Sequence, residues 1–286
     1  MSARQISASV AHGLHGRRRA GHGETFWQFR RFQSGEPARR IDWRRSARDD
    51  HLYVREREWE AAHTVWLWPD LSPSMDYRSR LAPVSKRDRA LVIALALADL
   101  VVRGGERVAV PGAMAPSARR RAAELVAHAI SLRAGSFSGF PDIAPVRRFS
   151  DLVIIGDFLD PIAGLADQIA RAAGEGIAGH LVMIVDPAEE SFPFEGRTEF
   201  TDPEGGPPIT FGSAAEARDH FVTRMQTRRR ALRDALDHAG WSLLVHHTDQ
   251  PPTQALMALH ARLSGHFDTR KAAYRETRPQ IDEALT

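Results

Sequence analysis

Apolar residues fall in short unbroken runs along most of the chain, and longer segments with helical spacing separate these runs. Runs of this kind lack the alternation of a half-exposed strand and are typical of strands buried on both faces of a sheet. The runs are HTVWLW (63–68), RVAV (107–110), DLVIIG (151–156), GHLVMIVD (179–186) and WSLLVHH (241–247). They predict a buried sheet.

The segments between these runs predict helices. In the clearest one, Leu91, Leu95, Ala98 and Val102 recur at helical spacing behind the N-cap candidate Ser85. Helices are expected over 85–103, 117–132 (capped by Ser117), 161–174, 213–238 and 252–264. Strands that alternate with helices indicate an α/β fold, a Rossmann-like, mostly parallel sheet with helices on both faces.

The segments around this alternating pattern have other compositions. We expect residues 1–23 to form a mobile N-terminal arm and residues 24–60 to form strands and turns that precede the α/β domain of 61–265. A Pro- and Gly-rich stretch near 187–212 predicts a hairpin insertion, and 266–286 reads as a charged C-terminal tail.

Composition narrows the function classes. The 286 residues include no cysteine, which excludes disulfides, thiolate nucleophiles and cysteine zinc sites. The longest apolar run, at 91–102, is interrupted by Asp99 and is shorter than the roughly 20 residues of a membrane helix. We therefore expect a cytoplasmic protein. Adjacent His246 and His247 point to opposite faces of a strand, so they are not expected to bind one metal.

A candidate metal site follows the first buried strand. The loop contains Asp70, Ser72 and Ser74, whose oxygens can converge from one tight turn, and Asp157 follows a later buried strand. Ligands in open α/β sheets gather at the carboxyl ends of the strands, and Mg²⁺ or Mn²⁺ accepts such hard oxygen ligands. The alternative is a purely structural role, in which these side chains cap a helix or form a turn and bind no metal.

This loop resembles the metal-ion-dependent adhesion site of von Willebrand factor A domains. The resemblance implies that Ser72 and Ser74 bind the metal directly, with Asp70 and Asp157 as further ligands. The Thr that supplies the middle ligand in those domains has no counterpart here. Either Ser136 or Ser138, in AGSFSGF (134–140), replaces it, or this ligand position is empty.

The second informative stretch is GETFWQFRRFQSGEPARRIDWRRSARDDHLYVREREWE, at 23–60. It resembles the signature of the bacterial domain-of-unknown-function 58 family, here with a Gly-Glu turn where that family usually has Gly-Asp. The residues that carry the resemblance are Arg30, Gly35, Arg39, Ile41, Asp42, Trp43, Ser46, Arg48, Arg55 and Glu56. The family implies a following von Willebrand factor A-like domain and a role as an accessory partner of MoxR-type AAA+ ATPases, without enzymatic activity.

The charged residues of this signature have alternative interpretations. Paired arginines and carboxylates, with arginine stacked on Trp43, would hold the segment against the sheet, or the same residues would bind a partner. Residues 1–60 carry 13 arginines and eight acidic residues, and this positive charge suggests nucleic-acid binding as a further hypothesis. The acidic residues between 42 and 60 would repel phosphates, so this hypothesis is the weaker one.

The leading hypothesis is a non-enzymatic protein-interaction module that holds Mg²⁺ or Mn²⁺ and binds an acidic residue of a partner, either a MoxR-type ATPase or its client. The first alternative is a metal-dependent hydrolase or phosphatase that uses Asp70 and Asp157. The second is a nucleic-acid-binding protein that uses the basic N-terminal region.

Overall fold

The chain folds into two compact units, which are described separately. One unit comprises residues 16–62, and the other comprises residues 1–15 and 63–286. The computed structural model describes residues 3, 5–8, 26–32, 38, 41–48, 51–57, 63–133, 135 and 137–276.

The small unit is a two-stranded antiparallel sheet with one helical turn. Strand β1 (Phe26–Arg31) pairs with β2 (Tyr53–Arg57), and α2 (Trp43–Ser46) lies between them in sequence. Ile41 bridges to Val54, and both side chains are buried. Strands β1 and β2 both lie in the segment 24–60, for which strands and turns were expected.

The large unit is built on a six-stranded sheet in the order β10-β7-β6-β3-β4-β5. All neighbouring pairs are parallel except β4 and β5, which confirms the expected mostly parallel sheet. The strands are β3 (Thr64–Pro69), β4 (Arg107–Val110), β5 (Met114–Ser117), β6 (Asp151–Gly156), β7 (Ala178–Val185) and β10 (Ser242–His247). The chain leaves β3 toward β4 and later returns to β6 on the other side of β3. The carboxyl ends of β3 and β6 therefore form a topological switch point, where ligands of such sheets bind.

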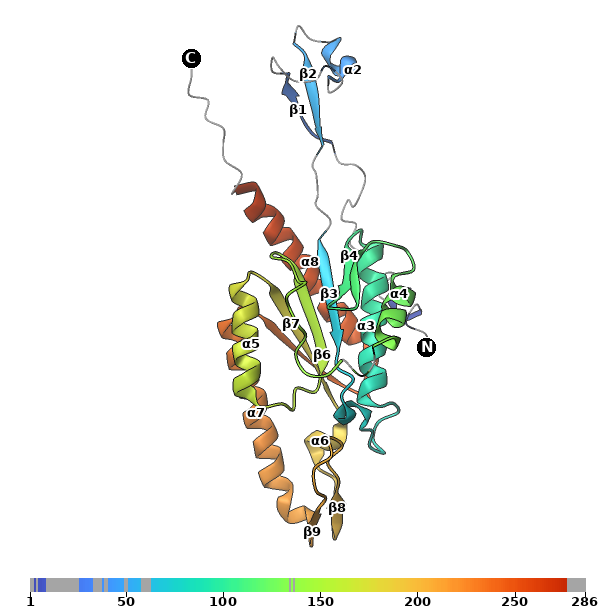
Figure 1. Cartoon of the computed structure of the whole chain (residues 1–286), viewed down its shortest axis with the longest axis vertical. Coiled ribbons are helices and arrows are strands. Elements are labelled where there is room, and N and C mark those ends of the chain that lie inside the picture. Colours follow the sequence, from blue (N-terminus) through green and yellow to red (C-terminus); the bar gives the residue numbers. More distant parts are fainter. Residues whose placement is uncertain are drawn as a thin grey trace. The chain divides into compact units, whose positions relative to one another are not determined.

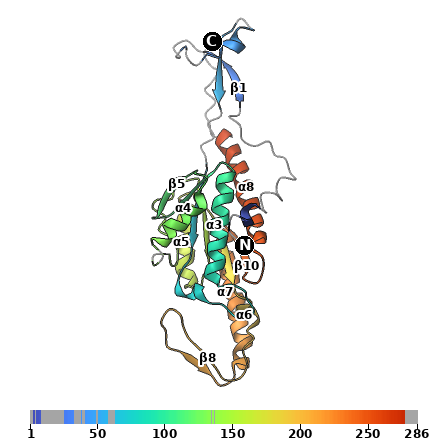
Figure 2. The same cartoon turned by 90° about the vertical axis from the view of Figure 1, so that its right-hand side faces the viewer.

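Helices cover both faces of this sheet (Figures 1 and 2). On one side α3 packs with α4 and α8, and on the other α5 packs with α7. The helices are α3 (Lys86–Arg103), α4 (Ala122–Ser131), α5 (Ile162–Gly174), α6 (Pro187–Ser191), α7 (Arg218–His238) and α8 (Pro252–Glu276). None of the helices in the described ranges is long and apolar enough to cross a membrane.

The expected insertion after β7 contains α6 and a hairpin. Strands β8 (Thr198–Phe200) and β9 (Ile209–Phe211) pair antiparallel, and the turn η4 (Ala214–Ala217) leads into α7. Both strands of this hairpin lie within 187–212.

Three helix boundaries differ from the sequence prediction. Helix α7 begins at Arg218 and not at Ser213, because the separate turn η4 precedes it. Ser117 does not cap a helix, because it ends the edge strand β5, and α4 begins at Ala122. Helix α8 does not stop near residue 264 but continues to Glu276. Gly265 weakens a helix by about 1 kcal/mol without ending it, and proline comes only at position 279.

The N-terminal segment differs in part from the expected mobile arm. Residues 5–8 are helical, and Ile6 and Ser7 are buried. The hydroxyl of Ser7 donates a hydrogen bond to Asp99 on α3. Burial of Ile6 and this polar contact tie the segment to the core, while residues 9–23 lie outside the described part of the chain.

Candidate functional site

The loop after β3 forms a tight polar turn at the switch point. The Asp70 amide donates to the carbonyl of Ile155 on β6, so the loop starts against the neighbouring strand. Asp70 Oδ1 then accepts a hydrogen bond from the Ser72 amide, 2.8 Å away. An aspartate that binds the backbone two residues ahead shapes such a turn. The turn continues into η2 (Pro73–Asp76), which places Ser72 and Ser74 beside each other.

Asp157 joins this loop from the end of β6. Ser74 Oγ donates to Asp157 Oδ2 at 2.8 Å, and the Oγ atoms of Ser72 and Ser74 are 3.1 Å apart. Because β3 and β6 are adjacent and parallel, their carboxyl ends bring together residues 83 positions apart. The structure thus brings Asp157 to the loop that carries Asp70, Ser72 and Ser74.

Gly156 allows this close approach. A Cβ atom at this position would lie 2.9 Å from the Cβ of Asp70 and 3.2 Å from its Oδ2. Real side chains do not tolerate such a contact without moving. Any larger residue here would push Asp70 away from the end of β6.

A buried lysine lies behind the candidate ligands. Lys86, the first residue of α3, is 1% exposed, and its Nζ lies 2.8 Å from Asp157 Oδ2 and 2.7 Å from Glu189 Oε1. Burial alone would lower the pKa of Lys86, but Asp157 and Glu189 outweigh it and raise that pKa above its ordinary value. Burial also raises the pKa of Glu189, although the Lys86 charge opposes this. The ammonium group therefore neutralises part of the acidic cluster.

Arg87 holds the same loop from its other side. Its guanidinium donates to the carbonyls of Leu71 and Ser72 and forms an ion pair with Asp76 at 2.7 Å. Two basic residues in the first turn of a helix oppose the helix dipole. Lys86 and Arg87 occupy this unfavourable position because they bind the loop and the carboxylates beside it.

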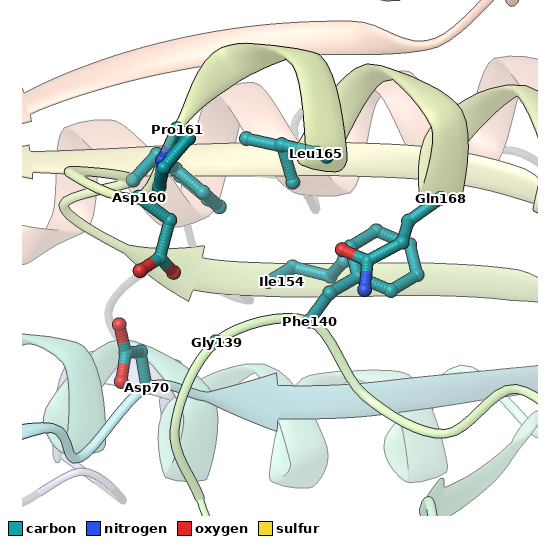
Figure 3. A pocket seen from close by; sticks show the side chains of 10 residues that line it. Asp70, Gly139, Phe140, Ile154, Asp160, Pro161, Leu165 and Gln168 are labelled. Carbon is teal, nitrogen blue, oxygen red and sulfur yellow. The ribbon is translucent and has the colours of Figure 1, made fainter.

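A cavity of about 320 Å³ opens next to Asp70. Phe140, Ile154 and Leu165 are among the side chains of its apolar walls, and Asp70 faces Asp160 across one end of it (Figure 3). Burial, together with smaller effects of the Asp157 and Asp160 charges, raises the pKa of Asp70 to about 6, against the hydrogen bonds from Ser72. This end of the cavity favours a positive charge, which would relieve the crowded carboxylates.

The loop on the β6 side of the cavity is held in a strained conformation. Phe158 has a φ of 53°, a left-handed value that is uncommon for a bulky residue. The Arg228 guanidinium on α7 donates to the carbonyls of Phe158 and Asp160 and so fixes this turn. Strain of this kind persists where surrounding contacts determine the backbone, and it is common at functional sites.

The oxygens of the loop fit a small divalent cation. An octahedral ion with ligands at about 2.1 Å has neighbouring ligand oxygens about 3.0 Å apart. The separations of 3.1 Å between the two serine hydroxyls and 2.8 Å between Ser74 Oγ and Asp157 Oδ2 match that spacing. Within the described ranges, no three His, Asp or Glu side chains form a metal-binding group, so a site here depends on the hydroxyls.

Ser138, one of the two serines expected to replace the missing Thr ligand, makes no described contact with the cluster. Ser136 lies outside the described residues, and Ser138 is exposed. The segment itself is adjacent, because the Leu71 amide donates to the carbonyl of Phe137. Among the described contacts, none joins Ser138 to Ser72, Ser74 or an aspartate of the site.

The family-signature residues have different positions in the small unit. Asp42 caps α2 by accepting from the Arg45 amide at 3.0 Å. The buried Ser46 donates to the carbonyl of Asp42 and accepts from the Tyr53 amide. Trp43 is 62% exposed, and Arg45 stacks over Tyr53 instead, at 4.7 Å from the ring centre. Asp42 and Ser46 are therefore structural, whereas Trp43 is available for contacts.

The other signature residues are less fully described. Ile41 belongs to the small core, and Arg48 is exposed. The backbones of Arg30 and Arg55 belong to β1 and β2, and Glu56 pairs with Gln28 in the sheet register. Gly35 and Arg39 lie outside the described residues.

Comparison with known proteins decides the family. The family model described as "Protein of unknown function DUF58" matches residues 28–128 and 142–231, which is more than half of the chain. The chain belongs to the DUF58 family. It is 28% identical over 266 residues to the uncharacterized protein Rv1480 of Mycobacterium tuberculosis (strain ATCC 25618 / H37Rv), covering 87% of this chain and 83% of that protein. Uncharacterized protein Mb1516 of Mycobacterium bovis matches to the same extent.

Among solved structures, the chain is similar to the conserved hypothetical protein BatB from Bacteroides thetaiotaomicron. The identity is 15% and the TM-score 0.39, over 71% of this chain and all of that chain. It is also similar to the SpRpn10 VWA domain, at 11% identity and a TM-score of 0.36, over 68% of this chain and 94% of that chain.

Three residues of the site were missed by sequence reasoning. They are Lys86, Glu189 and Glu204, whose carboxylate accepts a hydrogen bond from the Ser74 amide. One signal was available, since only two of the chain's 39 basic residues are lysines. In an arginine-rich chain, a lysine at the start of a core helix indicates a site that needs a compact ammonium group. The planar guanidinium group of arginine would not replace it there.

Proposed function

We propose that this DUF58 protein is a non-enzymatic protein-interaction module whose binding site is the loop cluster at the carboxyl ends of β3 and β6. The observation that carries the proposal is the convergence of the Ser72, Ser74 and Asp157 oxygens at the switch point of the sheet, at separations of 2.8 and 3.1 Å. Ligands of open α/β sheets bind at this place. The cavity beside Asp70 adds apolar surface for a partner side chain.

The cluster would hold Mg²⁺ or Mn²⁺ through Asp70, Ser72 and Ser74, with Asp157 completing the acidic set. The chemistry supplied there would be an electrophilic coordination position for a carboxylate oxygen of the partner. The chain's own groups shape the site: Arg87 fixes the loop backbone, and Lys86 fixes Asp157. Burial, and to a lesser extent the charges of Asp157 and Asp160, raise the pKa of Asp70, and a bound cation would stabilise its charged form.

The partner we propose is a MoxR-type AAA+ ATPase or a client of that ATPase. This part rests on the resemblance of the signature segment to DUF58 proteins. The exposed Trp43 supplies a second contact surface, since large aromatics are frequent anchors in protein interfaces.

Direct binding of purified proteins tests the proposal. The chain would be immobilised and titrated with a MoxR-type ATPase from the same organism by biolayer interferometry, in Mg²⁺ and in EDTA. We expect binding in Mg²⁺ that Asp70→Asn and the double variant Ser72→Ala/Ser74→Ala lose. Ser131→Ala, which removes an exposed hydroxyl on α4, serves as the matched control. Equal binding by all variants in EDTA would refute a role for this cluster.

A further inference from the structure

The cavity beside Asp70 has an apolar body and an acidic end. Its volume is about 320 Å³, and Phe140, Ile154 and Leu165 contribute apolar side chains to its walls. The carboxylates of Asp70 and Asp160 point toward each other at one end of it (Figure 3). Binding sites for small groups are commonly apolar pockets with a few convergent polar groups. This cavity therefore suits a group that has an apolar stem and a positively charged tip.

Hydrogen bonds hold the loops on both sides of this cavity. On one side, Trp68 Nε1 donates to the carbonyl of Gly139 at 2.8 Å. On the other side, Arg228 donates to the backbone carbonyls of Phe158 and Asp160. The cavity is therefore preformed, and a preformed site loses less free energy to ordering when it binds a ligand.

In the described part of the chain, the acidic end of the cavity has no ion pair with a lysine or arginine side chain. The charges that act on the pKa of Asp70 are those of Asp157 and Asp160, and both raise it. Arg228 contacts Asp160 through the backbone carbonyl and not through the carboxylate. Asp160 and Pro161 are exposed, so this end of the cavity opens to the surface of the protein. A cation from outside can therefore reach both carboxylates.

We infer that this cavity binds an arginine side chain of a protein partner. The methylene stem of the arginine lies along the apolar walls, and its planar guanidinium has five donors, enough to contact Asp70 and Asp160 together. Lysine would present a point charge without this planar arrangement of donors. Arginine is also frequent among the residues that dominate protein interfaces. The origin of the arginine in a protein partner rests on the proposed function, whereas the preference of the cavity for a guanidinium needs no metal.

An NMR titration of the full, ¹⁵N-labelled chain with Nα-acetyl-arginine methylamide, in EDTA at pH 7.5, tests this inference. The matched probe is the citrulline derivative, which has nearly the same shape and no charge. We expect the arginine derivative to shift the amide signals of Gly139 and Leu165, which line the cavity. It should bind at least about tenfold more tightly than the citrulline derivative, because hydrogen bonds between charged groups are the stronger ones.

Two variants locate the binding at the acidic end. Asp160→Asn removes one charge, and none of the described hydrogen bonds involves the Asp160 carboxylate, so the fold should be kept. Asp167→Asn, at an exposed position of α5 outside the cavity, is the matched control. We expect Asp160→Asn to weaken binding of the arginine derivative about threefold to fivefold, the upper range for an exposed ion pair, and Asp167→Asn to leave it unchanged.

The possible results separate this inference from the proposed metal site. Equal affinity for the arginine and citrulline derivatives, or full affinity in Asp160→Asn, would overturn the inference even in a chain that binds Mg²⁺. Binding of the arginine derivative in EDTA, with the expected loss in Asp160→Asn, would support the inference even in a chain that binds no Mg²⁺.

Discussion

The Nζ of Lys86 lies 2.8 Å from Asp157 Oδ2, the same oxygen that accepts the hydroxyl hydrogen of Ser74. This one carboxylate oxygen therefore links a permanent internal cation to a candidate metal ligand. The ammonium also contacts Glu189, so it connects β6, α3 and α6 behind the site. Lys86 therefore holds Asp157 and Glu189 together behind the loop that carries Ser72 and Ser74.

Replacing Lys86 with methionine should destabilise the large unit strongly. The change leaves Asp157 and Glu189 buried without their counter-charge, and breaking a buried pair in this way costs about 3–5 kcal/mol. Urea unfolding followed by tryptophan fluorescence measures the loss. Arg121→Met, which removes an exposed ion pair with Glu124, should cost less than about 1 kcal/mol. Similar stability of the two variants would show that the Lys86 pairs contribute little.

Asp70→Asn should stabilise the metal-free protein at neutral pH. The pKa of Asp70 is about 6 in the folded chain against 3.8 for the free group, so the folded state binds the proton more tightly. Stability from this group is present below about pH 4 and is lost as the pH rises through 6, amounting to roughly 3 kcal/mol at most. Urea unfolding in EDTA at pH 4.5 and 7.5 checks this. A variant less stable than the wild type at pH 7.5 would contradict it.

His246 should make the protein less stable in mild acid. The side chain is buried, its Nε2 has no hydrogen-bond partner in the described structure, and burial lowers its pKa to about 4. The unfolded chain therefore binds the proton more tightly between pH 6.5 and 4. Stability falls there by up to about 1.4 kcal/mol per pH unit. His246→Met should reduce this dependence, whereas His247→Gln, at a more exposed position, should leave it unchanged.

Gly156→Ala should destabilise the large unit by a steric clash with Asp70, without any change of charge. The added methyl group would meet Asp70 at 2.9 Å, so either the strand end or the aspartate must move, at a cost of about 1–3 kcal/mol. Gly164→Ala is the matched control, since nothing lies within 4 Å of its added methyl group and alanine favours helix α5. Thermal unfolding should place the two variants on opposite sides of the wild type. If Gly156→Ala matched the wild type, the close approach at Asp70 would not matter.

Much of the fold could be predicted because its determinants are local. Unbroken apolar runs gave the parallel strands, and Ser85 marked the start of α3 correctly by accepting from the Asp88 amide. The register of β3 beside β6 then explains why Asp157 meets the Asp70 loop. The wrong start of α4 has a local cause too, because Ser117 is a good cap residue whose backbone instead pairs with Val108 at the sheet edge.

The polar surroundings of the site could not be predicted in the same way. Lys86 reaches Asp157 and Glu189 across 71 and 103 positions, and Glu204 reaches Ser74 across 130. Such contacts depend on the paths by which α6 and the hairpin return to the sheet. The hydrophobic periodicity of the sequence does not determine these paths. Stacking of an arginine on Trp43 was one interpretation of the signature segment, but Arg45 stacks over Tyr53 of β2 and Trp43 is exposed.

Calorimetric titration of the wild type and of Ser72→Ala/Ser74→Ala with MgCl₂ tests the central claim most directly. The two hydroxyls are spaced as neighbouring ligands of one octahedral ion, so the wild type should bind one Mg²⁺ and the double variant should lose measurable binding. Circular dichroism should show that the double variant keeps its fold. Equal heats from both proteins, or no heat from the folded wild type, would contradict the claim.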